Sequence, residues 1–165
     1  MNLSLVNFTT YEISEDFFEK IIKKSEDFLE KNIKKILKGE GIKENYTLEI
    51  VLLGQRKMRS INKRYMGTNR VTDVLSFPFL EVAKTTKKDL QFIEPKETEK
   101  SLGEILLCPS KIKRNAKKFK KGFKEELTLV FIHGILHLLG YDHKNKEMTK
   151  RMRKREKEII QALGS

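Results

Sequence analysis

The sequence has few of the residues from which covalent cross-links and membrane segments are built. Its 165 residues include one cysteine, Cys108, which excludes an intramolecular disulfide and a structural zinc site made of cysteines. No apolar run approaches the roughly 18–20 residues that a membrane-spanning helix needs. The first residues lack the basic segment with which a secretory signal opens. We therefore expect a cytoplasmic protein in a reducing compartment.

Acidic residues are scarce relative to basic ones. Against 23 Asp and Glu stand 35 Lys and Arg, which gives a formal net charge of +12. This balance favours polyanionic partners such as nucleic acid, the ribosome or an acidic membrane face. A lysine-rich proteome would give the same balance, so charge alone leaves both explanations open. The content of 38% hydrophobic and 35% charged residues is typical of one globular domain over residues 1–165 with a charged surface.

Hydrophobic periodicity predicts an α+β fold in which a small mixed sheet of about four strands packs with about five helices. Strands are expected over residues 2–8, 46–53, 74–80 and 102–107. Helices are expected over residues 17–37, 55–65, 111–120, 125–139 and 145–163, the last of them within a basic C-terminal segment, 144–165. Pro78 marks the third strand as an edge strand or as one that ends at the proline. Residues 81–101 read as a long charged loop or an extended hairpin.

All three histidines of the chain, His133, His137 and His143, fall within 11 residues. His133 and His137 are one helical turn apart, so their Cβ atoms lie about 5–6 Å apart on one face. Two nitrogens on a tetrahedral zinc ion are separated by roughly 3.3 Å, a gap that histidine side chains can close. Gly140 permits the positive φ with which the chain can turn and bring back His143. The sequence thus predicts one zinc ion per chain at the end of a buried helix.

Three protein ligands leave a fourth position for water, which is the catalytic rather than the structural pattern of zinc binding. The alternative is that His133 and His137 are core histidines on an apolar helix, but buried unpaired imidazoles would cost stability. The histidine spacing equals that of the metzincin proteases. Those enzymes place a glutamate general base directly after the first histidine, and here that residue is Gly134. A protease of this type is therefore disfavoured.

Residues 133–143 match every defined position of the pattern H-G-x-L-H-L-x-G-Y-D-H, and so resemble the YbeY (UPF0054) family of bacterial endoribonucleases. The likeness continues at Thr72-Asp73-Val74-Leu75-Ser76-Phe77-Pro78, and more loosely at residues 102–105, where the family usually has Asp in place of Glu104. It covers roughly residues 50–145. The resemblance implies a zinc-dependent, single-strand-specific endoribonuclease that acts in 3′-end maturation of small-subunit (16S) rRNA and in ribosome quality control. It implies rRNA and the small ribosomal subunit as partners.

The sequence departs from the family at Met66, where the family commonly carries an arginine that faces the zinc and holds phosphate. Arg70, two residues before Thr72, is the first candidate to replace it as a catalytic residue, and Arg64 is the second. Both are equally well explained as surface arginines. The 81–101 loop is longer than is usual in the family, and it receives no role.

Two further groups of residues are candidates for the site. Asp142, next to the third histidine, can orient a ligand imidazole or act as a catalytic base, although a turn aspartate is an ordinary feature. A lysine cluster precedes the histidine helix and suits RNA phosphates, or is only a solvated face. Its members are Lys117, Lys118, Lys120 and Lys121. The basic C-terminal segment leaves the same two explanations open.

Two other functions compete with RNA cleavage. A zinc peptidase is disfavoured by Gly134 and by the charge of +12. A non-catalytic ribosome-assembly factor with a structural zinc ion is disfavoured because three ligands are present rather than four.

Overall fold

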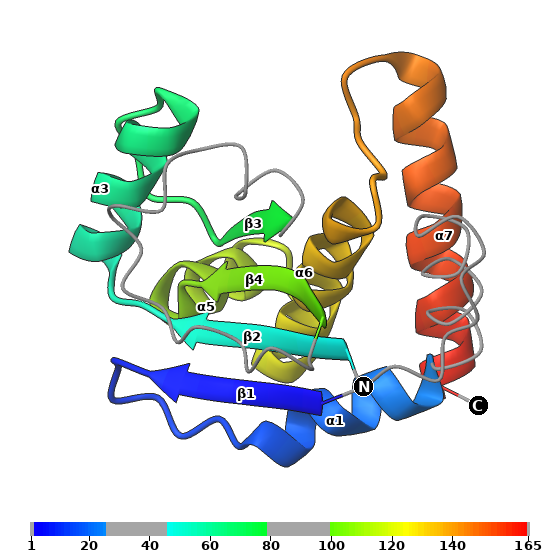
Figure 1. Cartoon of the computed structure of the whole chain (residues 1–165), viewed down its shortest axis with the longest axis horizontal. Coiled ribbons are helices and arrows are strands. Elements are labelled where there is room, and N and C mark those ends of the chain that lie inside the picture. The colour runs from blue at the N-terminus through cyan, green and yellow to red at the C-terminus, as the bar shows by residue number, and fades with distance from the viewer. Residues whose placement is uncertain (1, 26–45, 79–99, 165) are drawn as a thin grey trace.

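The computed structural model describes residues 2–25, 46–78 and 100–164, and within them it shows the predicted α+β architecture (Figure 1). One mixed sheet has the strand order β1-β2-β4-β3. Its strands are β1 (Asn2–Asn7), β2 (Tyr46–Leu52), β3 (Val74–Pro78) and β4 (Lys100–Leu107). β1, β2 and β4 are parallel, and β3 pairs antiparallel with β4. Among the described strands β3, which contains Pro78, lies at an edge of the sheet, one of the two positions predicted for it.

Five helices complete the described part of the chain: α1 (Glu15–Lys24), α3 (Gln55–Met66), α5 (Pro109–Lys118), α6 (Phe123–Leu138) and α7 (Lys146–Gly164). The ends of α3, α5, α6 and α7 lie within a few residues of the predicted ones. The predicted 17–37 helix is wrong at its end, because α1 stops at Lys24, where Ser25 caps it. β4 begins at Lys100, so the end of the predicted 81–101 loop is wrong, because Lys100 and Ser101 pair with β2. The rest of that loop and the second half of the predicted 17–37 helix lie outside the described residues. None of the described helices combines the length and the apolar character needed to cross a membrane.

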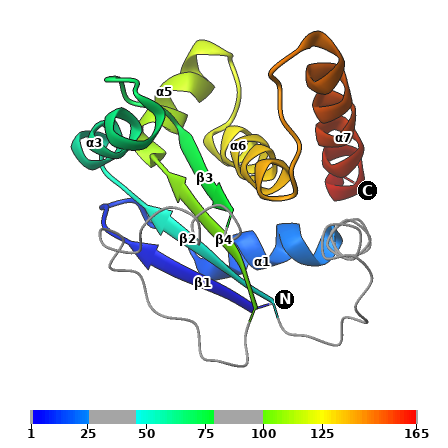
Figure 2. The same ribbon diagram turned by 45° about the horizontal axis from the view of Figure 1, so that its top comes forward.

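One face of the sheet carries the main core. Alternate residues of β2, Leu48, Ile50 and Leu52, are at most 1% exposed and pack against α1, α5 and α6. α7 runs alongside α6, farther from the sheet (Figures 1 and 2), and adds Met152 and Ile159 to the same core. The mostly apolar α6 is thus enclosed by the sheet on one side and by helices on others, which is why it is buried.

The opposite face of the sheet has a smaller core under α3, built on Val51, Leu106 and Met58. Glu104 lies on this face, because its neighbour Ile105 points to the main core. Burial, and then the charge of Glu49 on the paired strand, raise the pKa of Glu104 to about 7. The loosely matching 102–105 segment therefore directs its acidic residue away from the histidines.

α6 approaches the sheet closely at Gly134. The Ser76 hydroxyl of β3 donates a hydrogen bond of 3.0 Å to the Gly134 carbonyl. A Cβ atom at position 134 would lie 3.1 Å from Cγ2 of Ile105 and 3.2 Å from Oγ of Ser76. The position at which a metzincin carries its glutamate therefore faces the sheet here, and even a Cβ atom there would be tighter than ordinary van der Waals contact.

Candidate metal centre

The end of α6 is a turn that reverses the chain toward the helix it has just left. Gly140 has φ of 80°, which confirms the positive φ expected there. Its N–H donates to the His137 carbonyl at 3.0 Å, and the N–H of Tyr141 donates to the Leu136 carbonyl at 2.9 Å. This pair of bonds is a Schellman motif, in which glycine avoids the strain of a left-handed residue with a side chain.

The start of α7 holds the other side of the same turn. The Asn145 side chain accepts a hydrogen bond of 2.8 Å from the N–H of Met148, as an N-cap residue does. The Thr149 hydroxyl contacts the carbonyls of His143 and Asn145 at 3.2 and 2.8 Å. His143 is therefore carried on a short segment that is fixed at both ends.

This turn brings the three histidines together. One ring nitrogen from each lies within 4.8 Å of the others. The Nε2 atoms of His133 and His137 are 3.1 Å apart, close to the separation expected on a tetrahedral ion. Burial first, and then the neighbouring His133 and His143, lower the pKa of His137, which favours the neutral imidazole that metals bind. Three imidazoles suit zinc and other borderline transition metals rather than magnesium or calcium.

Within the described residues, the cluster has three members. His133 and His137 are half-buried, whereas His143 is exposed. Three protein ligands are the number found in catalytic rather than structural zinc sites.

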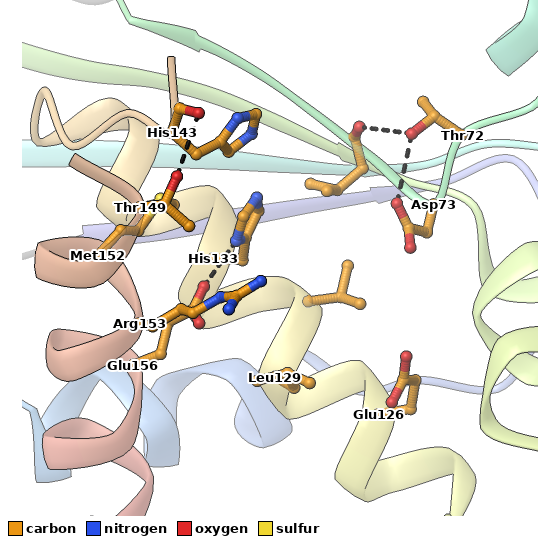
Figure 3. A pocket seen from close by; sticks show the side chains of 12 residues that line it. Thr72, Asp73, Glu126, Leu129, His133, His143, Thr149, Met152, Arg153 and Glu156 are labelled. Carbon is orange, nitrogen blue, oxygen red and sulfur yellow. Dashed lines mark hydrogen bonds and ion pairs between the residues drawn. The ribbon is translucent and has the colours of Figure 1, made fainter. Parts of the chain in front are cut away.

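Glu156 of α7 orients the first histidine. Its Oε1 atom lies 2.7 Å from Nδ1 of His133, and the two side chains are 16% and 30% exposed (Figure 3). When Nδ1 donates its proton to the carboxylate, Nε2 keeps a free lone pair directed at the centre of the cluster. The tautomer and the angle of the ring are then fixed before a metal ion arrives.

We expect Glu156→Ala to weaken zinc affinity about 10- to 100-fold, the usual effect of losing such a partner. Affinity can be measured by competition with a chromophoric chelator, and the absorption spectrum of bound cobalt reports the geometry. Glu158→Ala is the matched control, because Glu158 is on the same helix and pairs with Arg155 instead. Equal affinities for the two variants would show that Glu156 only packs against His133.

A cavity of about 420 Å³ opens in front of His133 and His143. Its walls come from α6, from α7 and from Thr72 and Asp73 just before β3 (Figure 3). Asp73 accepts a hydrogen bond of 2.9 Å from the Asn115 side chain, which ties this wall to α5. The Thr72–Pro78 segment therefore shapes the cavity through Asp73 and positions α6 through Ser76.

The remaining candidates from the sequence lie at or beyond the edges of this cavity. Asp142 accepts from the His143 N–H at 2.7 Å and pairs with Lys144 at 2.8 Å, so its contacts are with the turn. Arg70 is exposed, on the loop that leads to Thr72. Arg64 lies over the ring of Tyr65, which packs against the smaller core on the far side of the sheet.

The four lysines Lys117, Lys118, Lys120 and Lys121 line neither this cavity nor the one next to it on α7. Nζ of Lys121 lies 3.7 Å from a carboxylate oxygen of Glu126. Glu126 is near the start of α6 and lines the cavity at its end. The cluster is therefore separated from the histidines by much of the length of α6.

Sequence reasoning missed two residues that the structure places at the site. Glu156 holds His133, and Arg153 reaches from α7 into the cavity (Figure 3). One feature of the sequence could have identified Glu156, because it is an acidic residue within the run of cations that forms α7. Arg153 had no distinguishing signal among its basic neighbours.

Comparison with known proteins gives one consistent result. The model of the endoribonuclease YbeY family matches residues 12–164. The endoribonuclease YbeY of Thermodesulfovibrio yellowstonii is 40% identical over 117 residues, 70% of this chain and 66%, just under two thirds, of that protein. The Clostridioides difficile protein of the same name is 33% identical over 153 residues, 93% of this chain and 90% of the relative. The solution structure of a Thermotoga maritima protein is similar with a TM-score of 0.57 at 26% identity, covering 98% of this chain and 88% of that one.

Proposed function

This chain belongs to the endoribonuclease YbeY family, and from that premise we propose that it is a zinc-dependent endoribonuclease that cleaves single-stranded RNA. Its substrate in the cell is the 3′ end of small-subunit (16S) rRNA, and its partners are that rRNA and the small ribosomal subunit in the cytoplasm. The net charge of +12 supports a polyanionic substrate.

The observation that carries the proposal is the convergence of three imidazoles within 4.8 Å beside a cavity of about 420 Å³. His133, His137 and His143 would hold the ion. A divalent ion bound there would supply Lewis-acid chemistry, by which water is acidified and a phosphoryl oxygen is polarised. The protein itself fixes the ligand rings, through Glu156 and the two capped helix ends, and shapes the cavity in which a phosphodiester lies.

We assign supporting roles to residues around this cavity. Arg70 is proposed to stabilise the charge that develops on the phosphate, and Asp142 is proposed to accept a proton from the attacking water. RNA phosphates farther along the strand are proposed to contact the lysine cluster at the end of α5, namely Lys117, Lys118, Lys120 and Lys121.

The competing functions find less support. A metzincin-like peptidase needs a glutamate at the position of Gly134, which packs tightly against Ile105 and Ser76 of the sheet. A purely structural zinc site needs a closed coordination sphere, whereas the cluster within the described residues has three members and His143 is exposed.

The test is cleavage of single-stranded RNA by the purified chain, with and without a chelator. We expect cleavage with zinc, loss of cleavage after chelation, and recovery with zinc but not with magnesium, because three imidazoles bind magnesium poorly. A precursor that contains the 3′ end of small-subunit rRNA should be cut in preference to an unrelated strand of equal length. Cleavage that survives full removal of metal, as checked by elemental analysis, would refute the proposal.

A further inference from the structure

A second cavity of about 820 Å³ adjoins the metal site, and α7 and the turn before it supply its walls. Nine residues line it, of which six are cationic and none is Asp or Glu. The six are Lys144, Lys146, Lys150, Arg153, Lys154 and Lys157. A hollow with this lining concentrates positive potential and attracts polyanions. We call it the α7 groove.

The cations of the groove form a row along one side of α7. Lys146, Lys150, Lys154 and Lys157 recur at helical spacing, and they span about 16 Å of helix at 1.5 Å per residue. Buried Met152 anchors a different side of the same helix in the core. Within the described part of the chain these four lysines form no ion pair, whereas Lys144 pairs with Asp142 at 2.8 Å. The row is therefore free to neutralise an external anion.

The α7 groove is continuous with the cavity of the metal site. His143, Thr149 and Arg153 line both hollows. Arg153 extends from α7 into the first of them (Figure 3). A strand whose phosphate lies at the histidines can thus continue directly along α7.

We propose that the α7 groove binds the backbone of single-stranded RNA next to the phosphate that is cleaved, an inference that rests on the proposed endoribonuclease function. The lining contains no Phe, Tyr or Trp. Contacts are therefore made to phosphates and not by base stacking, so the groove holds the strand without reading its sequence. The lysine cluster of α5 lines neither hollow, which makes it a secondary contact.

The test compares two quadruple variants with the same change of charge. The first is K146Q/K150Q/K154Q/K157Q, and the second is K117Q/K118Q/K120Q/K121Q. Binding of the zinc-loaded protein to fluorescent oligouridylate is measured by anisotropy over a range of salt, and a gel confirms that the strand is intact. Each lost phosphate contact lowers the slope of log affinity against log salt by about 0.7. We expect the α7 variant to lose up to about 3 from this slope, and the α5 variant to lose less.

A third variant, R56Q/K57Q/R59Q/K63Q, removes four exposed cations from α3 and controls for net charge. Equal loss in all three variants would overturn the inference in favour of nonspecific attraction. An unchanged slope in the α7 variant would overturn the inference about the α7 groove. The proposed function would still be supported in that case if the unaltered chain cleaves RNA. If the α7 variant lost binding only to phosphatidylserine vesicles, the groove would be a membrane surface. Failure of the unaltered chain to cleave RNA would instead refute the function itself.

Discussion

Changing His137 to Ala is expected to reduce bound zinc from about one ion per chain to almost none, and to reduce RNA cleavage by a factor on the order of 10³ or more. His137 is the middle ligand of the cluster. Its Nε2 atom is 3.1 Å from that of His133, and its ring centroid is 5.1 Å from that of His143. Without His137, two imidazoles remain, and two ligands are too few to hold the ion against competing chelators.

Elemental analysis after gel filtration measures the zinc, and cleavage of single-stranded RNA measures the activity. Because His137 is half-buried, its loss can also disturb α6. His143→Ala provides the second variant, since His143 is exposed on a turn and its removal leaves the core intact. Circular dichroism should show an unchanged fold for it. Full zinc content in both variants would disprove the ligand assignment.

The parts of the site that the sequence predicted are those set by local geometry. The interval of four residues placed His133 and His137 on one face of α6, and a glycine at position 140 indicated the turn whose φ is 80°. Pro78 indicated an edge strand or a strand end, because proline has no N–H to donate to a neighbouring strand. Each of these inferences needs only neighbouring residues and the hydrogen bonds that they make or lack.

The parts that the sequence did not predict depend on how α7 returns over α6. Glu156 is 23 residues from His133, and no periodicity connects them across the turn at residues 139–145. The α5 lysines also show that distance along the chain differs from distance in space. They precede α6 in the chain, but the histidines lie toward the other end of that helix, and His133 is about 15 Å from its start at 1.5 Å per residue.

The second large effect is expected from an arginine that faces the phosphate. Negative charge builds on the non-bridging oxygens during hydrolysis, and a fixed donor stabilises it. Met66, at the position where the resemblance implies an arginine, is 50% exposed and cannot donate. Arg153 lines the cavity of the metal site together with His133 and His143, whereas Arg70 lies on the loop that leads to Thr72 at the wall of this cavity. We therefore expect Arg153→Ala to lower kcat about 10²–10³-fold, more than Arg70→Ala, and Arg64→Ala to change little.

These rates must be measured at saturating RNA with zinc content confirmed, because Arg153 also lines the α7 groove. A binding role raises KM, whereas a role in charge stabilisation lowers kcat. Arg153→Lys keeps the charge without the planar donor pair and should recover part of the rate. Arg151→Ala is the matched control on α7, since Arg151 is exposed and lines neither hollow. If neither Arg153→Ala nor Arg70→Ala loses even about tenfold, neither of these arginines supplies the charge. The next candidates are then the lysines of the α7 groove and the ribosome that presents the substrate.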